Sequence, residues 1–562
     1  MTSVAPFLIF YVGGALAAVT SGRLRQAVLL GTPVLGAVNL YYLPEGPSGL
    51  LALFDYTLVL VRVDKLSLVF GYVFHLAAFL GAIYALHVRD GVQHVASTFY
   101  AGSSIGALFS GDFITLFVFW ELTAITSVFL ILARRTDRAQ ATAIRYFAIQ
   151  ILSGMLLLAG ILIWTSHTGS ITFDYIGLDA PGGWLILLAF GIKCAFPLLH
   201  NWLTDAYPEA TPTGTIFLSA LTTKLAVYTL ARGYPGTEIL VYIGATMTMF
   251  PIFYAVIEND LRRVLSYSLI NQVGFMVTGI GIGTELAING AAAHAFVHIV
   301  YKALLFMSMG AVLDRVGKID GSELGGLYKS MPITAVFCII GAASISAFPL
   351  FSGFIAKSMI LSAAIKEGYL VVWLFLLFAS AGVFHHSGIK IPYFAFFAHD
   401  AGIRVKEARP NMLVAMFLAA FVCIFVGVYP APLYRILPFP VDYDPYTVSH
   451  VLVQCQLLFF SALAFVVLQL TKLYPPELPG VNIDSEWLYR RLLPRAAGFL
   501  LEQAHHLGVR LERGARIGLG LWIERVFHLH GPRGVLARTW TTGSTVFAVV
   551  FVFAVVLVFA YL

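Results

Sequence analysis

Long uninterrupted runs of apolar residues, separated by short polar stretches, dominate the pattern of this chain. A helix that crosses the hydrocarbon core of a bilayer needs about 20 predominantly apolar residues, and many runs approach that length. The pattern therefore predicts an all-α polytopic membrane protein. The predicted spans lie near 4–20, 27–43, 66–87, 97–111, 113–133, 142–166, 184–203, 211–232, 237–257, 264–284, 287–312, 332–365, 368–398, 411–431, 449–472 and 541–562.

Two segments depart from this simple pattern. Residues 332–365 are too long for one straight helix and contain Pro349, so we expect a single helix that is broken near the proline. Residues 50–62 are too short and too often interrupted by polar residues to cross a bilayer. They are more typical of a pair of strands at the surface.

Composition supports a membrane protein. Of 562 residues, 59% are hydrophobic and 11% are charged, whereas soluble proteins average about 25% charged residues. The net charge of +6 therefore reflects membrane topology and not nucleic-acid binding. Basic residues gather in alternate loops, which places those loops in the cytoplasm and the N-terminus outside. These loops carry Arg23, Arg25, Arg89, Arg134, Arg135, Arg138, Arg262, Arg263, Arg315, Lys318, Lys329, Arg404, Lys406 and Arg409.

The sequence argues against redox and nucleotide chemistry. Its four cysteines are scattered in apolar runs without a C-x-x-C pair, which disfavours an iron–sulfur cluster, a zinc site or a disulfide framework. It contains neither a P-loop nor a dinucleotide-binding fingerprint. We expect no cofactor, no metal site and no enzymatic activity in the chain itself, so energy must come from an ion gradient or a partner.

Two blocks of about five spans each occupy residues 97–232 and 237–398, between N-terminal helices at 1–96 and C-terminal core helices at 399–472. An odd number of spans per block predicts that the second block is inverted relative to the first. The tetrapeptide Ala-Phe-Pro-Leu at 195–198 recurs at 347–350, at the corresponding place in the second block.

The composition changes beyond residue 472. Residues 473–540 place charged residues between apolar ones, a pattern typical of amphipathic helices on a membrane surface or along a partner protein. Residues 541–562 form a final span. No role beyond this location is predicted for the tail.

Three charged residues in the first block lie inside apolar runs. Lys193 precedes Pro197 by four residues, so we expect the helix that carries it to be kinked or broken. Lys224 lies in the middle of the next run, too far from its ends to snorkel easily to the headgroups. Glu121 has no basic residue before Arg134. A charge beside a broken helix in a transporter is typical of an ion site.

The second block repeats this pattern. His294, His298 and Lys302 follow one another at intervals of four and form one stripe on a helix. Lys357 follows the second break. Lys390 is close enough to the cytoplasmic end either to snorkel or to be the exit of a relay. His385 and His386 are adjacent and face different ways on an α-helix, so we expect neither to join a metal pair or a relay.

These residues suggest a proton relay through the middle of the membrane, because titrating one group changes the pKa of the next by Coulomb coupling. The relay is predicted to connect to the two sides through the helix breaks at Pro197 and Pro349. Its members are Glu121, Lys193, Lys224, His294, His298, Lys302 and Lys357, with Lys390 as a possible exit.

Several motifs resemble the antiporter-like subunits shared by respiratory complex I and the multi-subunit Mrp-type Na+/H+ antiporters. They are FVFWELTAITS, GIKCAFPLLHNWLTDAYPEATPT, TLARG, ENDLRRVLSYSLINQVG, HAFVHIVYKALLFMSMG and AFPLFSGFIAK, and they cover roughly 64–400. The resemblance implies about fourteen core helices with two inverted five-helix repeats, and it implies the same relay residues. One departure is Thr204, where the family usually has proline. GVFHHSGIKIPYFAFF and IDSEWLYRR are most similar to the D subunit of Mrp-type antiporters.

The resemblance implies a hetero-oligomeric assembly in the cell (inner) membrane that exchanges protons for Na+ or another monovalent cation. Two alternatives remain open. One is a proton-pumping subunit of a complex I-type quinone oxidoreductase or a membrane hydrogenase, and the other is a membrane subunit of an inorganic-carbon uptake complex. A purely structural anchor would instead leave activity intact when Glu121 or Lys224 is neutralised.

Overall fold

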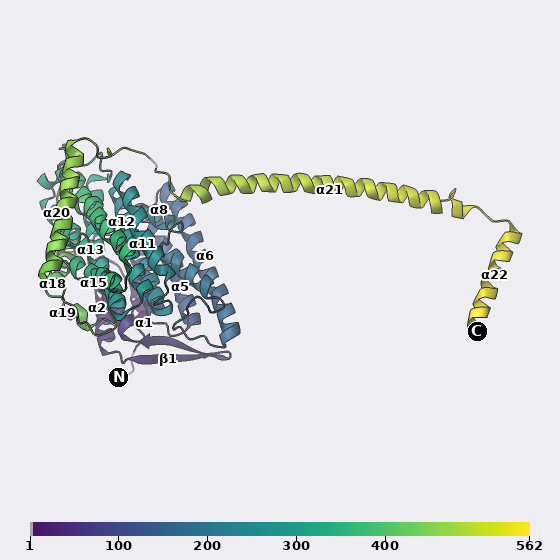
Figure 1. Ribbon diagram of the computed structural model, residues 1–562, viewed down its shortest axis with the longest axis horizontal. Helices are drawn as coiled ribbons and strands as arrows, with labels where there is room; N and C mark the ends of the chain where they lie inside the picture. The colour runs from purple at the N-terminus through teal and green to yellow at the C-terminus, as the bar shows by residue number, and fades with distance from the viewer. Residues whose placement is uncertain (1–3, 481) are drawn as a thin grey trace. The chain divides into compact units, whose positions relative to one another are not determined.

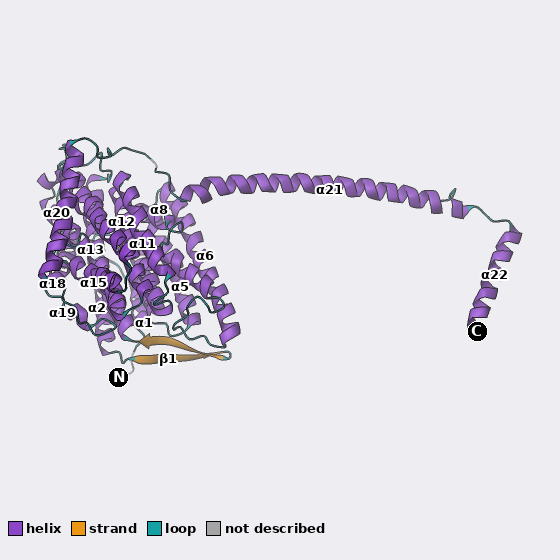
Figure 2. Cartoon of the chain, viewed as in Figure 1, coloured by secondary structure: helices purple, strands orange, loops and turns teal. Residues whose placement is uncertain are grey.

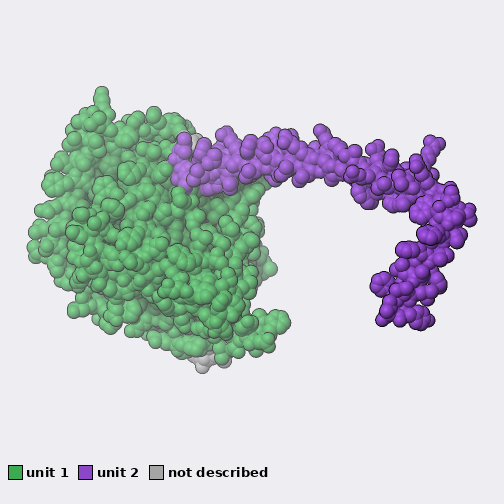
Figure 3. Space-filling view, turned by 45° about the vertical axis from the view of Figure 1, so that its right-hand side comes forward, with its two compact units in different colours: residues 1–482 green, residues 483–562 purple. Residues whose placement is uncertain are grey.

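Helices make up nearly all of the fold (Figure 2). A computed structural model of the protein describes residues 4–480 and 482–562. The chain forms two compact units, residues 1–482 and 483–562 (Figure 3). Eleven helices of the described residues are long and apolar enough to cross a membrane, and three shorter apolar helices accompany them. The predicted all-α multi-pass membrane fold is confirmed.

The first part of unit 1 contains the predicted pair of strands. Helices α1 (Pro6–Val19) and α2 (Gly22–Tyr42) precede the antiparallel hairpin of β1 (Gly46–Leu53) and β2 (Tyr56–Val63), which lies near the N-terminal end in Figure 1. The strands extend further toward the N-terminus than residues 50–62. Helix α3 (Lys65–Ala85) follows directly.

Each of the two blocks contains both continuous and divided helices. The first block contains α4 (Gly91–Phe109), α5 (Phe113–Leu132), α6 (Asp137–Thr168), α7 (Gly183–Cys194), α8 (Asn201–Glu209), α9 (Gly214–Ala220) and α10 (Thr222–Gly233). The second contains α11 (Ile239–Ile257), α12 (Leu261–Ile282), α13 (Glu285–Val316), α14 (Pro332–Ile345), α15 (Ser352–Lys366), α16 (Leu370–Val383), η2 (Phe384–Ile389), α17 (Lys390–Pro392) and η3 (Tyr393–Phe397).

The two blocks share local details as well as their order of helices. Asp112 caps α5 by accepting a hydrogen bond from the Thr115 amide, and Asp260 caps α12 in the same way through the Arg262 amide. Each aspartate also forms an isolated antiparallel bridge with the segment that follows the next helix, to Thr172 and to Asp320. Asp112 therefore has a structural role at the start of α5.

The repeated Ala-Phe-Pro-Leu segments have the same strained backbone. Ala195 and Ala347 have φ values of 63° and 57°, and Leu198 and Leu350 have φ values of 69° and 72°. The amide of the phenylalanine that follows each alanine bonds to the carbonyl five residues earlier, as in a Schellman motif. Each helix thus ends before its proline, and α8 and α15 begin only after a gap. Both predicted helix breaks are confirmed.

The structure adds breaks that the sequence pattern does not predict. The span expected at 211–232 is divided at Leu221, because the Thr222 amide donates to the Tyr100 hydroxyl instead of continuing the helix. The span expected at 368–398 changes from α-helix to π-helix at η2 and again at η3. Such π-turns are rare and often lie at functional sites.

Two further helices of unit 1 follow the blocks. They are α18 (Pro410–Val428) and α20 (Val448–Leu470), with the short α19 (Ala431–Arg435) between them. Unit 2 contains the π-turn η4 (Leu488–Leu492), one 38-residue helix, α21 (Leu493–His530), the short η5 (Val535–Ala537) and the apolar helix α22 (Thr542–Tyr561) (Figure 1). The amphipathic tail is thus mainly a single long helix.

Candidate functional site

Glu121 is carried by α5 and directs one carboxylate oxygen into the protein. This Oε1 atom is buried and makes no hydrogen bond within the described part of the chain. It lies against Gly154 of α6, where an added Cβ would come within 1.3 Å of it. A glycine on α6 therefore provides the space that the carboxylate occupies.

Lys193 lies in the last turn of α7 and is fully buried. Its ammonium donates to the Trp120 carbonyl at 2.6 Å and to Thr123 Oγ1 at 2.8 Å, and it lies 4.2 Å from the centre of the Trp120 ring. It also interacts electrostatically with the Glu121 carboxylate. The predicted glutamate and lysine are thus neighbours, and the ammonium is held by α5.

Lys224 occupies the unexpected break between α9 and α10. Its ammonium donates to the Ser219 carbonyl at 2.6 Å and to Thr223 Oγ1 at 3.1 Å. The break at Leu221 places this carbonyl within reach of a lysine five residues later. Because Lys224 is fully buried, the alternative that it snorkels to the headgroups is wrong.

The predicted stripe on α13 is buried in the centre of unit 1. His294 Nε2 lies 3.2 Å from Gln272 Oε1 and 2.9 Å from the Tyr301 hydroxyl, and the two rings of His294 and His298 are 6.1 Å apart. Within the described residues, neither ring nitrogen of His298 has a hydrogen-bond partner. Lys302 donates to Ser268 Oγ at 2.9 Å. Gln272 and Tyr301 lie in motifs that carried the resemblance, but nothing in their spacing singled them out.

Lys357 lies at the second helix break. Its ammonium donates to the carbonyl of Ile345, the last residue of α14, at 2.7 Å and lies 5.1 Å from the centre of the Phe275 ring. The C-terminal end of a helix carries a partial negative charge, which favours a cation there. The divided helix therefore provides a site for the lysine.

Glu121 and Lys193 interact in the first block, and the groups around α13 interact with lysines of both blocks. Lys224 interacts electrostatically with Cys194, the neighbour of Lys193, and with His294, His298 and Lys302. Lys357 interacts with the same three residues of α13. The structure thus brings the seven predicted residues together along the interior of unit 1 and turns none of the lysines or histidines among them toward the surface.

Lys390, the possible exit, is also fully buried, so its snorkelling alternative is wrong. Its ammonium donates to the carbonyls of Ala255, Val256 and Glu258, at the end of α11. A carboxylate oxygen of Glu477 lies 2.9 Å from the ammonium. Glu477 follows α20, far from Lys390 in sequence, and no local pattern predicts that it pairs with a buried lysine.

His386 takes part in a hydrogen-bonded network, although its position next to His385 predicted no part in a metal pair or a relay. On the π-turn η2 its Nδ1 lies 2.9 Å from Ser387 Oγ, and Ser387 donates to Ser268 Oγ at 2.8 Å. Ser268 is also bonded to Lys302. The expectation assumed α-helical geometry, which the chain abandons at Phe384.

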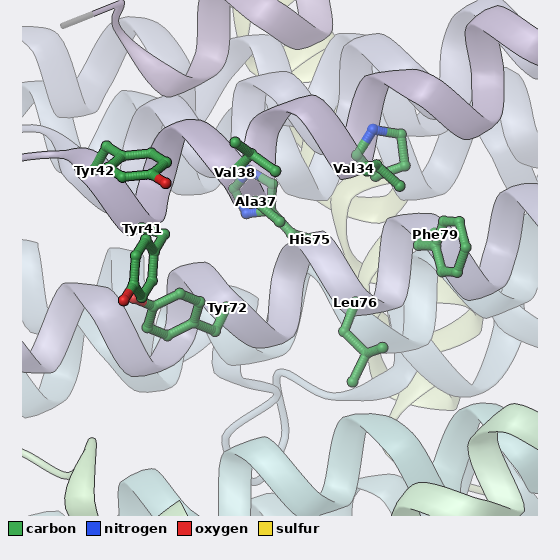
Figure 4. Close-up of a pocket in the computed structure, with 10 residues that line it drawn as sticks. Val34, Ala37, Val38, Tyr41, Tyr42, Tyr72, His75, Leu76 and Phe79 are labelled. Atoms are coloured by element: carbon green, nitrogen blue, oxygen red, sulfur yellow. The ribbon is translucent and has the colours of Figure 1, made fainter.

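A separate pocket of about 460 Å³ lies between α2 and α3 (Figure 4). Tyr41, Tyr42 and Tyr72 line it together with apolar side chains and His75, whose Nδ1 is bonded to the Gly71 carbonyl at 2.7 Å. None of the predicted relay residues lines this pocket. We assign it no part in the relay.

Comparison with known proteins places this arrangement among membrane transporters. Residues 110–385 match the family described as NADH:quinone oxidoreductase/Mrp antiporter, TM. The chain is 31% identical over 338 residues to the D subunit of the Na(+)/H(+) antiporter of Alkalihalophilus pseudofirmus, covering 56% of this chain and 67% of that protein.

Two solved structures share the fold. A chain of the Mrp complex from Dietzia sp. DQ12-45-1b matches with a TM-score of 0.69 and 22% identity, covering 80% of this chain and 97% of that one. A chain of the membrane-bound sulfane sulfur reductase, an archaeal respiratory membrane complex, matches with a TM-score of 0.71 and 20% identity, covering 99% of both chains. The chain belongs to the NADH:quinone oxidoreductase/Mrp antiporter family of transmembrane proteins.

Proposed function

We propose that this chain is the proton-translocating subunit of a multi-subunit antiporter that exchanges protons for Na+ or another monovalent cation. Protons pass along the buried groups of both blocks. These groups are Glu121, Lys193, Lys224, His294, His298, Lys302 and Lys357, with Lys390 as an exit.

The observation that carries this proposal is the series of buried ionisable groups along the interior of unit 1. A charged side chain at the centre of a helix costs about 2.5–3.5 kcal/mol on insertion scales, so such residues usually serve transport. Here Glu121 interacts with Lys193, and Lys224 and Lys357 each interact electrostatically with the three residues of α13. The similarity to the D subunit of an Na(+)/H(+) antiporter supports proton and cation exchange as the function of that series.

Coulomb interaction provides the coupling between the groups. Two unit charges 4 Å apart interact by about 4 kcal/mol at an effective dielectric constant of about 20. A proton that arrives at Glu121 therefore weakens the electrostatic attraction that keeps Lys193 protonated. Loss of the Lys193 proton then alters the electrostatic field at Lys224, and titration of Lys224 alters the field at the residues of α13. The half-helices at the two breaks end in backbone carbonyl and amide groups. The lysines can gain and lose protons beside these polar groups.

We further propose that the chain carries no redox or nucleotide chemistry of its own. It works in the cell (inner) membrane with other subunits, and its N-terminus faces outward. The arginine-rich loops support this orientation, because positively charged loops remain in the cytoplasm.

A second candidate is a proton-pumping subunit that is driven by electron transfer elsewhere in a complex. One observation favours it. The chain of the sulfane sulfur reductase covers 99% of this chain, whereas the Mrp chain covers 80%. The fold of the full length, tail included, thus has a counterpart in a respiratory complex.

The proposal is tested with inside-out membrane vesicles that contain the chain and its co-expressed partner subunits, in a host without its own antiporters. A pulse of Na+ or K+ is given, and proton movement is followed with a pH-sensitive dye. Lys224→Met should slow the exchange about tenfold or more, since a positioned proton donor typically contributes about 10²–10⁴-fold. Lys366→Met, at the exposed end of α15, is the matched control and should leave the rate unchanged.

Normal exchange by Lys224→Met would refute the relay. Proton movement that needs an electron donor and not a cation pulse would favour the second candidate. The proteins that co-purify with the chain distinguish the two candidates independently, because only a redox-driven complex includes cofactor-binding subunits.

A further inference from the structure

The helix that begins as α16 changes its winding where it passes the centre of the second block. At η2 the backbone is π-helical, and Lys390 follows on the short α17 before a second π-turn at η3. A π-turn interrupts the regular hydrogen bonds of an α-helix. Such turns are rare and occur frequently at functional sites. Here it positions His386 and Ser387, both fully buried.

A chain of hydrogen bonds joins this π-turn to the relay. Lys302 Nζ donates to Ser268 Oγ at 2.9 Å, Ser387 Oγ lies 2.8 Å from Ser268 Oγ, and His386 Nδ1 lies 2.9 Å from Ser387 Oγ. All four side chains are fully buried. Within the part of the chain that the structure describes, the other ring nitrogen of His386 has no hydrogen-bond partner. A buried polar atom without a partner costs about 1–3 kcal/mol, so its retention calls for an explanation.

The same helical segment leads on to a buried ion pair. Lys390 lies four residues after His386 and interacts with it electrostatically. Its ammonium donates to three carbonyls at the end of α11 and also forms an ion pair with the Glu477 carboxylate at 2.9 Å. The carboxylate of Glu258, held by Asn482 at 3.1 Å, lies beside this pair. Burial raises the pKa of the Glu477 carboxyl, although Lys390 acts in the opposite direction.

This end of the path lies on the face that the loop charges assign to the cytoplasm. Asp260, Arg262 and Arg263 begin α12 directly after Glu258. Lys302 lies near the middle of α13, so the chain of groups runs from the middle of the membrane toward this face.

We propose that Ser268, Ser387 and His386 form a proton branch from Lys302 toward the cytoplasmic face, and that Lys390 and Glu477 complete it. The branch rests on the proposed relay and adds to it a path to one side of the membrane. In the direction away from the relay, the Lys302 ammonium gives a proton to Ser268 Oγ. Ser268 at the same time passes its hydroxyl proton to Ser387 Oγ, and Ser387 passes its hydroxyl proton to His386 Nδ1. Lys302 is left neutral and His386 becomes an imidazolium, so charge and protons balance. After this transfer the Ser387 hydroxyl donates to Ser268, as it does in the structure, and rotation of both hydroxyl groups toward His386 prepares the next transfer.

A purely structural network is the competing explanation, in which the same bonds only hold the π-turn in place. The two explanations differ at Ser387. A proton branch needs a hydroxyl group at this position, so Ser387→Thr should function and Ser387→Ala should not. Both variants need a normal amount of assembled complex in the membrane for the comparison.

The test uses the complete assembly in inside-out vesicles, with cation-driven proton movement as the readout. Ser387→Ala and His386→Leu should slow proton movement about tenfold or more, in line with the loss of a positioned proton donor. The Ser387→Thr variant should move protons at close to the rate of the unmodified protein. His385→Leu is the matched control, because His385 packs edge-on against Phe465 and tilted against Tyr474 and lies outside the bonded chain. It should also stay close to the unmodified rate.

Glu477 provides an independent test if a variant in the π-turn does not accumulate. Glu477→Gln should slow proton movement and Glu477→Asp, which keeps a carboxylate, should restore most of it. Glu323→Gln removes an exposed carboxylate paired with Lys318 on the same predicted face, and it should have no effect.

Normal proton movement in Ser387→Ala, His386→Leu and Glu477→Gln, together with loss of movement in Lys224→Met, would overturn the branch and leave the relay in place. Equal loss in Ser387→Ala and Ser387→Thr, with the complex assembled, would also overturn it in favour of a structural network. Normal movement in Lys224→Met would remove the relay itself.

Discussion

At the scale of single residues, the site depends on where neighbouring side chains leave space or offer oxygens. Lys193, Lys224 and Lys357 all direct their ammonium groups to backbone carbonyls, two of which lie at a helix break. A carbonyl stabilises an ammonium without fixing it as a permanent ion pair, so the lysine can still lose its proton. Glu121 instead depends on the absence of a side chain at Gly154.

Gly154→Ala should therefore impair transport more than it impairs folding. The added methyl group would come within 1.3 Å of the present position of Glu121 Oε1, and the flexible end of the glutamate would move aside at little cost in stability. Cation-driven proton movement should fall about tenfold while the amount of assembled protein stays normal. Gly31→Ala, on α2 with no atom within 4 Å of the added group, is the control and should change neither. Normal transport by Gly154→Ala would show that Glu121 does not act from this position.

At the scale of elements, the two breaks show how much of the architecture is encoded locally. The repeated Ala-Phe-Pro-Leu segment predicted both breaks, because proline disfavours an α-helix in the residues before it. The breaks at Leu221 and Phe384 have no such marker. The first depends on Tyr100, which is far away in sequence, and the second brings His386 to Ser268 across the fold. Contacts of this kind are set by tertiary packing, so the sequence pattern predicted continuous helices in both places.

The left-handed alanines at the breaks give a prediction at this scale. An alanine in the left-handed region costs roughly 1–2 kcal/mol, whereas glycine adopts it freely but loses about 0.4–1 kcal/mol through the greater freedom of the unfolded chain. Ala195→Gly and Ala347→Gly should therefore leave the thermal unfolding temperature of the purified protein unchanged or raise it. Ala189→Gly, within α7, should lower it, because glycine in a helix costs about 1 kcal/mol relative to alanine. Lower unfolding temperatures in all three variants would show that the backbone at the breaks is not strained.

At the scale of the whole molecule, the sequence predicted the membrane-spanning helices and the ionisable residues among them, because apolar run length, proline and charge are visible in the sequence itself. It did not reveal Glu477 or the link through Ser268. No local sequence pattern marks these residues as functional. Their contacts form only when α11, α12 and the segment after α20 pack together in the fold. The tail was predicted to be amphipathic, but its continuity as the single helix α21 was not.

The long helix of unit 2 has an apolar side that the rest of unit 2 leaves uncovered. At 1.5 Å per residue its 38 residues extend about 57 Å, well beyond the roughly 30 Å of a bilayer's hydrocarbon core, and it carries charges throughout. Leu511 and Trp522 are eleven residues apart, which places them on one side of the helix, and both are exposed. Such a stripe fits either a membrane surface or a partner subunit.

We expect a partner subunit to cover this stripe, because the proposed function requires an assembly. Leu511→Gln combined with Trp522→Gln should lower the amount of partner subunits that co-purify with the chain, since each buried apolar side chain contributes about 1.5–3 kcal/mol. Arg513→Gln combined with Glu524→Gln, also eleven residues apart but on the opposite side, is the matched control and should leave co-purification unchanged. If the first pair instead leaves all partners bound but weakens binding of the isolated tail to lipid vesicles, the helix lies on the membrane surface and the partner interface must lie elsewhere.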